Sequence, residues 1–216
     1  MSKEAPDVEA IVAGIARNKK YRAIGVTEST IRDIVLSELA RQPNAKAAMQ
    51  SARKKLHEVM ALYLGDPDYD AARAQLEAAY ASGDAATIRA ACAAIMREHD
   101  STRERLPLLD EFYPRLFAVT GTPQTLLDIA CALNPLALPW MGLPPGARYY
   151  AYDIHRQRVE FLSGYLALAG LDGAALEQDI LVDYPRESGD VALLLKEIHR
   201  MEKRRKGIVL PLLDAL

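Results

Sequence analysis

Hydrophobic residues recur at helical spacing through the first hundred residues and then change to short, continuous apolar runs. The helical spacing predicts helices over residues 45–64, 69–81 and 84–98, and no strand-like alternation precedes residue 120. Apolar runs follow at 125–130, 149–154, 176–180 and 191–195, with helical patterns at 136–141 and 157–169 between them. Strands that are apolar throughout and alternate with helices predict a parallel sheet covered on both faces.

This change of pattern divides the chain into a helical domain, residues 1–100, and an α/β domain, residues 101–216. A capping box at Ser101 and Glu104 predicts one further helix that leads into the first strand. The expected fold class is α/β, a Rossmann-like, doubly wound parallel sheet preceded by an all-helical N-terminal domain. Ligands of such sheets bind beyond the carboxyl ends of the strands.

Composition and charge indicate a cytoplasmic protein with one basic region. Half of the 216 residues are hydrophobic, and the sequence has neither a signal peptide nor an apolar run of the ~18 residues that a membrane span needs. Cys92 and Cys131 lack metal-binding spacing, so we expect both to be reduced and buried, with no metal site. Residues 1–60 contain eleven Lys or Arg and seven Asp or Glu, in a chain of net charge −2. Local positive charge favours nucleic-acid binding, although uneven charge is also common in helical proteins.

The turn after the first strand has small residues where a nucleotide-like ligand would approach the backbone. Ala130 and Ala132 follow Asp128 at positions where glycines are expected. Asp153 ends the second strand, where a carboxylate can accept hydrogen bonds from ribose hydroxyls, and Asp179 ends the third, where it can accept from an adenine amino group. A single acid is often a solvated terminus or helix cap, but three at successive strand ends favour a nucleoside. A nicotinamide-dependent oxidoreductase shares the ribose-binding acid and is disfavoured by the missing GxGxxG turn.

Four blocks of sequence carry a family resemblance: His99–Pro107, Asp128–Met141, Tyr149–Ile154 and Leu193–Lys196. In this order they resemble blocks of the aminoglycoside-resistance 16S rRNA (guanine-N7) methyltransferases, the Arm/Rmt family, and residues 19–22 and 54–57 resemble that family's rRNA-binding helices. The resemblance implies transfer of a methyl group from S-adenosylmethionine to N7 of guanine 1405, in the decoding site of 16S rRNA within the 30S subunit. It further implies that the protein is a monomer, that its activity confers aminoglycoside resistance, and that it has neither a DNA nor a membrane partner.

The resemblance also implies a set of cofactor-binding residues. Arg105 would pair with the carboxylate of S-adenosylmethionine, Asp153 would hold the ribose, and Asp179 with Ile180 would frame the adenine. Alternatively, Arg105 is a surface arginine, because only one of Arg103 and Arg105 can point inward. The full expected set is Arg105, Asp128, Ala130, Ala132, Asp153, Ile154, Asp179, Ile180 and Leu195.

Guanine N7 carries a lone pair and no proton, so alkylating it requires no general base. We therefore expect no catalytic acid or base, and His57 and His99 are not candidates; proximity and alignment would supply the rate. Trp140 is the candidate platform for the extruded base, and a core tryptophan is the alternative. Contacts with rRNA phosphates are expected from Arg17, Lys19, Lys20, Arg22, Arg53, Lys54, Lys55 and Lys196, the last of which could instead cap its strand.

Two features set the chain apart from the family pattern. The family has glycine at the position of Ala132, whose methyl group would lie close to the cofactor. Methyltransferases of this class have seven strands, whereas four are expected here before the helical residues 201–216, so we expect that the last strands are lacking from this chain, which is either truncated or a shortened relative. The alternative function is a shortened or diverged relative that binds rRNA or cofactor without this activity, or that methylates another RNA site.

Overall fold

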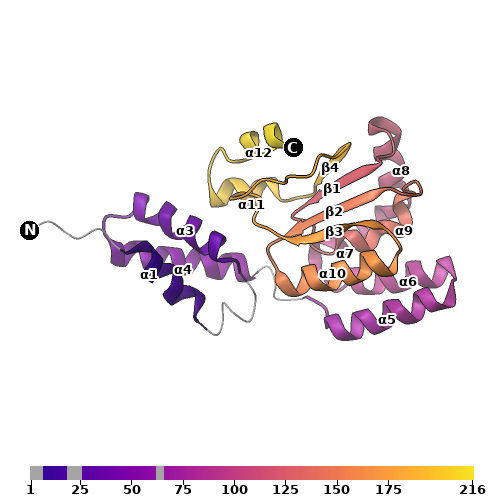
Figure 1. The fold of residues 1–216 in the computed structure, drawn as a ribbon, viewed down its shortest axis with the longest axis horizontal. Coiled ribbons are helices and arrows are strands. Elements are labelled where there is room, and N and C mark those ends of the chain that lie inside the picture. The colour runs from indigo at the N-terminus through magenta and orange to yellow at the C-terminus, as the bar shows by residue number, and fades with distance from the viewer. Residues whose placement is uncertain (1–6, 19–25, 62–65) are drawn as a thin grey trace, which may run out of the picture. The chain divides into compact units, whose positions relative to one another are not determined.

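A computed structural model describes residues 7–18, 26–61 and 66–216 (Figure 1). The chain forms two compact units, Met1–Leu64 and Gly65–Leu216. In the described part, no strand precedes residue 125, so the expected all-helical N-terminal region is confirmed. None of the described helices is long and apolar enough to cross a membrane.

The first unit contains α1 (Val8–Ala16), α3 (Glu28–Arg41) and α4 (Ala45–Ala61). Thr27 caps α3, because its Oγ1 accepts from the backbone N–H of Thr30 at 3.2 Å. An ion pair between Lys55 Nζ and Glu38 Oε1, 2.6 Å apart, joins α4 to α3. The core of the unit consists of Val12, Ile15, Ile31, Ile34, Val35, Ala52 and Leu56.

The second unit is built on a four-stranded parallel sheet with the order β3-β2-β1-β4, which confirms the expected fold class. Its strands are β1 (Thr125–Ile129), β2 (Arg148–Asp153), β3 (Asp172–Glu177) and β4 (Val191–Leu194). Every residue of β1 is buried, as expected for a central strand covered on both faces. The carboxyl ends of β1, β2 and β4 therefore meet at one edge of the sheet.

The prediction of the third strand at residues 176–180 was wrong. The strand begins at Asp172, where Gly173 and the alanines after it give no hydrophobic signal, and its register is set by pairing with β2. Gly173 has φ +131°, and a Cβ there would lie 1.9 Å from the backbone oxygen of Tyr149. Asp179 consequently lies in the turn after β3 and not at the end of the strand.

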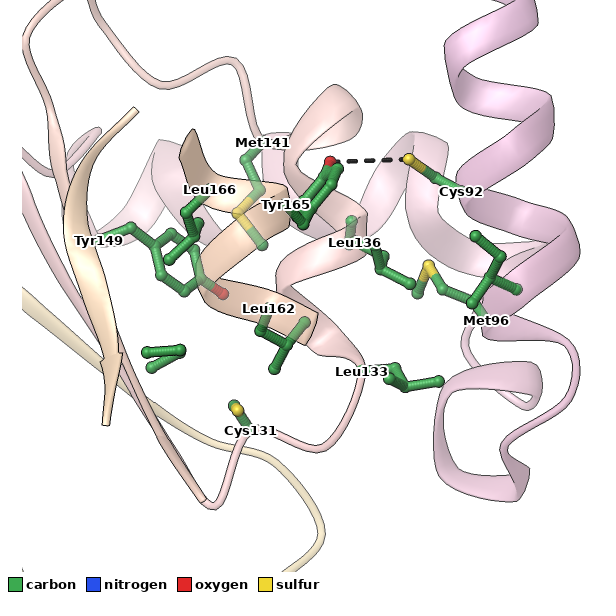
Figure 2. Close-up of a cluster of buried hydrophobic side chains, with 14 of the residues drawn as sticks. Cys92, Met96, Cys131, Leu133, Leu136, Met141, Tyr149, Leu162, Tyr165 and Leu166 are labelled. Carbon is green, nitrogen blue, oxygen red and sulfur yellow. Dashed lines mark hydrogen bonds between the residues drawn. The ribbon is translucent and has the colours of Figure 1, made fainter. Parts of the chain in front are cut away.

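Helices cover the two faces of the sheet (Figure 1). One face, which includes Leu126 and Tyr149, is covered by four helices: α5 (Tyr69–Ser82), α6 (Ala85–Met96), α8 (Leu109–Thr120) and α10 (Arg156–Leu168). The other face, which includes Leu127 and Tyr152, is covered by α11 (Ile198–Arg204) and α12 (Val209–Ala215). The core between the sheet and α5, α6, α8 and α10 contains Cys92 and Cys131, both free and buried as expected. Cys92 Sγ lies 3.6 Å from the hydroxyl of Tyr165 (Figure 2).

The boundary between the units lies at residue 64, whereas the sequence pattern placed it at residue 100. Leu76 of α5 and Cys92, Ile95 and Met96 of α6 share one core with the strands. Hydrophobic periodicity marks where helices give way to strands. It does not mark which helices share a core with the strands.

The expected continuous helix from Ser101 is broken into three pieces. They are α7 (Asp100–Arg103), with His99 as its N-cap residue, the 3₁₀ helix η1 (Leu106–Leu108), and α8. Pro107 lies in η1, and it cannot donate the backbone hydrogen bond that an α-helix interior requires. Arg105 therefore lies in the link between α7 and η1.

Candidate active site

The turn after β1 has two alanines in the left-handed backbone region. Ala130 has φ +52° and Ala132 has φ +49°, and Lys196, just after the adjacent strand β4, has φ +66°. This conformation costs roughly 1–2 kcal/mol for a residue other than glycine. The backbone N–H of Cys131 donates to the carbonyl of Tyr152 at 2.9 Å and fixes the turn to β2. Such strain at neighbouring strand ends is typical of functional sites.

Asp128 lies under this turn and is 1% exposed. Its Oδ2 accepts from the hydroxyl of Tyr149 at 2.6 Å and from Nδ2 of Asn134 at 3.0 Å, and Asn134 Oδ1 accepts from Tyr113 at 2.8 Å. Burial raises the pKa of Asp128 to about 7, against the lowering effect of the hydrogen bonds from Tyr149 and Asn134. The network attaches Asp128 to Asn134, so Asp128 holds the turn in place from below.

Asp153 connects the turn to the start of α10. Its Oδ2 accepts from the backbone N–H of Ala132 at 3.1 Å and from Nη1 of Arg158 at 2.9 Å, and its Oδ1 accepts from the backbone N–H of His155 at 2.9 Å. The structure thus brings together Asp153 and the β1 turn, as the sequence predicts. Arg158, which sequence reasoning missed, is buried and makes an ion pair with Asp153.

Arg105 is the inward-pointing member of the pair Arg103 and Arg105. Its Nε is buried and has no hydrogen-bond partner in the described part of the chain. Its positive charge lowers the pKa values of the buried Asp128 and Tyr113, although their burial raises both values more strongly. Arg103 instead has a half-exposed side chain and pairs with Asp100. An unsatisfied guanidinium N–H near this edge is suited to an anionic group.

Asp179 lies beyond β3 and is held by α11. Its Oδ1 accepts from the backbone N–H of Leu181 at 3.1 Å, and its Oδ2 lies 2.7 Å from Nη2 of Arg204. Ile180, the other residue expected at the adenine, is buried between β3 and α11. Sequence reasoning missed Arg204, because its position in a run of basic residues gives no sign that it faces inward.

The remaining residues of the expected cofactor set lie at or just beyond the strand ends. Ile154, after β2, and Leu195, after β4, are both partly buried. Lys196 is exposed and pairs with Glu104, which precedes Arg105 in the chain. Among the described residues, no group of three His, Cys, Asp or Glu side chains could hold a metal ion.

The structure does not bring Trp140 to this edge. Trp140 belongs to α9 (Leu138–Met141), and its ring lies 5.6 Å from the guanidinium carbon of Arg89 on α6. Leu138 lines a groove together with Leu171, the residue just before β3. This groove therefore lies near the amino ends of the strands, opposite the β1 turn, and Trp140 packs against the core there.

The expected phosphate-binding residues of the first unit fall into three groups. Arg17, at the end of α1, and Arg53 and Lys54, on α4, are exposed. Lys55 is partly buried because it pairs with the buried carboxylate of Glu38. Three further residues, Lys19, Lys20 and Arg22, lie outside the described residues.

Comparison with known proteins gives consistent matches over nearly the whole chain. The FmrO family, described as ribosomal RNA methyltransferase (FmrO), matches residues 17–216. A 16S rRNA (guanine(1405)-N(7))-methyltransferase of Micromonospora echinospora is 36% identical over 212 residues, which are 96% of this chain and 77% of that protein. The solved structure of the 16S rRNA methylase RmtB is similar with a TM-score of 0.75 and 30% identity, over 98% of this chain and 81% of RmtB. The 16S rRNA methyltransferase RmtF, solved in complex with S-adenosyl-L-homocysteine, is similar with a TM-score of 0.72 and 29% identity, over 99% of this chain and 78% of RmtF.

Proposed function

Because the chain belongs to the FmrO family of ribosomal RNA methyltransferases, we propose that it transfers a methyl group from S-adenosylmethionine to N7 of guanine 1405 in 16S rRNA. The target is that of its relative in Micromonospora echinospora. The observation that carries the proposal is the meeting of the strained β1 turn, Asp153 and the unsatisfied Arg105 at one sheet edge. Methylation of this guanine would confer aminoglycoside resistance.

The residues at this edge fit a ligand with an amino-acid end and a nucleoside end. Arg105 would hold the ligand carboxylate, the backbone at Ala130 and Ala132 would lie along the methionine chain, and Asp153 would accept from the ribose. Asp179 and Ile180 would border the adenine. In the related RmtF, the solved complex contains S-adenosyl-L-homocysteine, the demethylated form of the same ligand.

The chemistry requires alignment more than proton transfer. S-adenosylmethionine supplies an electrophilic methyl group, and neutral guanine N7 presents a lone pair without a proton. Leu195, after β4, would border the space where the two meet. Holding the reacting atoms ~3–3.5 Å apart supplies several kcal/mol without an acid–base residue.

The alanine at position 132 is compatible with this function. Ala132 adopts the left-handed conformation at φ +49°, and its N–H still reaches Asp153. The methyl group has therefore not displaced the turn from Asp153. This observation favours the active enzyme over the alternative of a diverged relative that has lost cofactor binding.

A methylation assay tests the proposed function. Purified protein is incubated with 30S subunits and S-adenosylmethionine, and the rRNA is analysed by primer extension and mass spectrometry. We expect a single 7-methylguanosine at position 1405, and none in 30S subunits in which guanine 1405 is replaced by adenine. A methyl group at another nucleotide, or at N1 of an adenine, would contradict the target while leaving methyl transfer intact.

We also propose that the enzyme acts as a monomer in the cytoplasm, on the assembled 30S subunit and not on free rRNA. Its proposed partner is a folded RNA surface, for which several separate phosphate contacts supply affinity. Comparing methylation of 30S subunits with that of naked 16S rRNA tests the preference. Light scattering of the purified protein tests the monomer.

Charge reversal of the exposed Arg53 and Lys54 should weaken binding to the 30S subunit. The slope of log K against log salt is negative, and each lost phosphate contact reduces its magnitude by about 1, so the double variant Arg53→Glu/Lys54→Glu should reduce the magnitude by about 2. The slope is obtained by measuring the affinity for 30S subunits at salt concentrations between about 50 and 200 mM. An unchanged slope would remove α4 from the RNA-binding surface.

Lys55 requires a different substitution, because Lys55→Glu would place a second carboxylate next to that of the buried Glu38. Lys55→Gln should lower the free energy of unfolding by about 1–3 kcal/mol, since it leaves the Glu38 carboxylate without its ion pair. Chemical denaturation measures this loss. Such a loss would identify Lys55 as a residue that stabilises the first unit, in contrast to Arg53 and Lys54, which are proposed to contact RNA.

A further inference from the structure

A buried cluster of polar side chains, here called the Asp153 cluster, surrounds the carboxylate proposed to bind ribose. Its members are Asp66, Tyr69, Asp153, His155 and Arg158. Arg158 donates through Nη1 to Asp153 Oδ2 at 2.9 Å and through Nη2 to Asp66 Oδ1 at 2.6 Å. The side chains of Arg158, Asp153 and Asp66 are only 3%, 6% and 9% exposed. One guanidinium therefore bridges two buried carboxylates.

Asp66 is itself held in place from its other oxygen. The hydroxyl of Tyr69 donates to Asp66 Oδ2, and Nδ1 of His155 lies 3.2 Å from the same oxygen. Burial would raise the pKa of Asp66, but His155, Arg158 and Tyr69 together lower it to about 2. A charged Asp66 thus fixes Arg158 from the side opposite Asp153.

The cluster joins segments that are far apart in sequence. Asp66 precedes α5, whereas Arg158 lies in the first turn of α10, 92 residues later. The ring of Tyr69 packs on Phe161, one turn further along α10, with ring centroids 5.1 Å apart. These contacts fix the start of α10 relative to α5, so the guanidinium has little freedom to move.

The hydrogen bonds on Asp153 are divided unequally between its two oxygens. Oδ2 accepts from both Arg158 and Ala132, whereas Oδ1 accepts from the backbone N–H of His155. A carboxylate oxygen can accept about two hydrogen bonds. Within the part of the chain that the structure describes, an acceptor position therefore remains on Oδ1.

We propose that Arg158, held by Asp66, is a positioning residue that orients Asp153 so that Oδ1 accepts a hydrogen bond from the ribose of S-adenosylmethionine. Arg158 touches neither the cofactor nor the reacting atoms and acts through Asp153. The inference rests on the proposed function. The competing explanation is that the cluster stabilises the fold and has no effect on ribose recognition.

A comparison of two ligands separates these explanations. Isothermal titration gives the dissociation constants of S-adenosylhomocysteine and of its 2′,3′-dideoxy analogue, which lacks the ribose hydroxyls. We expect the wild-type protein to prefer the parent ligand by about tenfold, as for one hydrogen bond to a charged group. In Arg158→Gln the preference should fall to about twofold or less, because Asp153 is no longer held in the accepting orientation.

Two further variants complete the design. Asp66→Asn keeps the size of the side chain and an acceptor for Nη2, so it carries the test if Arg158→Gln does not fold, and we expect an intermediate preference. Arg156→Gln, on the same helix, removes an exposed ion pair with Glu177 and should leave the preference at the wild-type value. In the methylation assay, Asp66→Asn should raise the KM for S-adenosylmethionine and leave kcat within about twofold of wild type.

The outcomes distinguish this proposal from the function on which it rests. If the variants bind both ligands more weakly but keep the wild-type preference, the cluster is purely stabilising and the positioning role is overturned. If the wild-type protein binds neither ligand, the proposed function fails together with this inference. Wild-type binding without any preference between the ligands would overturn only the role assigned to the ribose hydroxyls and Asp153.

Discussion

Replacing Arg105 with glutamine should raise the dissociation constant for S-adenosylmethionine by about 100-fold. Arg105 Nε is buried without a hydrogen-bond partner in the described part of the chain, so a ligand carboxylate would complete its hydrogen bonding. Truncating one member of such a charged pair costs ~2–5 kcal/mol, and ~3 kcal/mol corresponds to roughly 100-fold. Isothermal titration with S-adenosylmethionine measures the change directly.

The neighbouring arginine supplies the matched control. Arg103 has the same side chain two residues away, but it is half-exposed and pairs with Asp100 at the surface. Arg103→Gln should therefore change the dissociation constant by less than about twofold, since exposed ion pairs contribute little. Equal losses in the two variants, or no loss in Arg105→Gln, would assign the ligand carboxylate to another group. Arg105→Lys, which keeps the charge and loses the two-pronged donor, should fall between wild type and Arg105→Gln.

The acids at the strand ends could be predicted from the sequence, but their partners could not. Asp153 is recognisable because it follows an apolar run at the spacing of a parallel sheet, whereas Asp179 was expected within the run at residues 176–180 and lies in the turn after β3. Their cations, Arg158 and Arg204, lie in helices where a charged residue is usually solvent-exposed. Only the packing of α10 and α11 on the sheet shows that both arginines face inward.

Two elements that are close in sequence to an expected site or domain lie elsewhere in the fold. Trp140 follows the β1 turn by eight residues, yet η2 (Asn134–Ala137) and α9 carry it toward the opposite edge of the sheet. The helices α5 and α6 lie next to the basic helices in sequence, yet they share a core with the strands. Periodicity gives the type of an element, and the assignment of helices to a core depends on which apolar faces meet.

Ala132 shows the reverse case, in which the structure answers a question raised by the sequence. An alanine at a glycine position suggests a displaced turn, because a left-handed conformation is unfavourable for alanine. The hydrogen bond from Ala132 to Asp153, together with that from Cys131 to Tyr152, holds the residue in this conformation. The cost of one strained alanine is small enough for these neighbouring contacts to offset.

Replacing Gly173 with alanine should lower the free energy of unfolding by about 3 kcal/mol or more. A Cβ at this position would lie 1.9 Å from the backbone oxygen and 2.7 Å from the carbonyl carbon of Tyr149, and φ of +131° is unfavourable for alanine. The obstacle is the backbone of β2, so no side-chain rotation can relieve it. For a protein of this size, the loss corresponds to a melting temperature lower by roughly 6–12 °C, measurable by circular dichroism.

The same substitution also affects the proposed cofactor site, because β2 and β3 pair in register from Arg148 with Asp172 to Asp153 with Glu177. Forcing the strands apart at Tyr149 would shift Asp153 relative to Asp179, so affinity for S-adenosylmethionine should fall along with stability. Gly164 is the control: it lies within α10 with no atom within 4 Å of an added Cβ. Gly164→Ala should raise stability by about 0.5–1 kcal/mol, since alanine restricts the unfolded chain and favours the helix. A Gly173→Ala protein that melts within a degree of wild type would contradict the Tyr149–Gly173 register, and with it the pairing of Asp153 with Glu177.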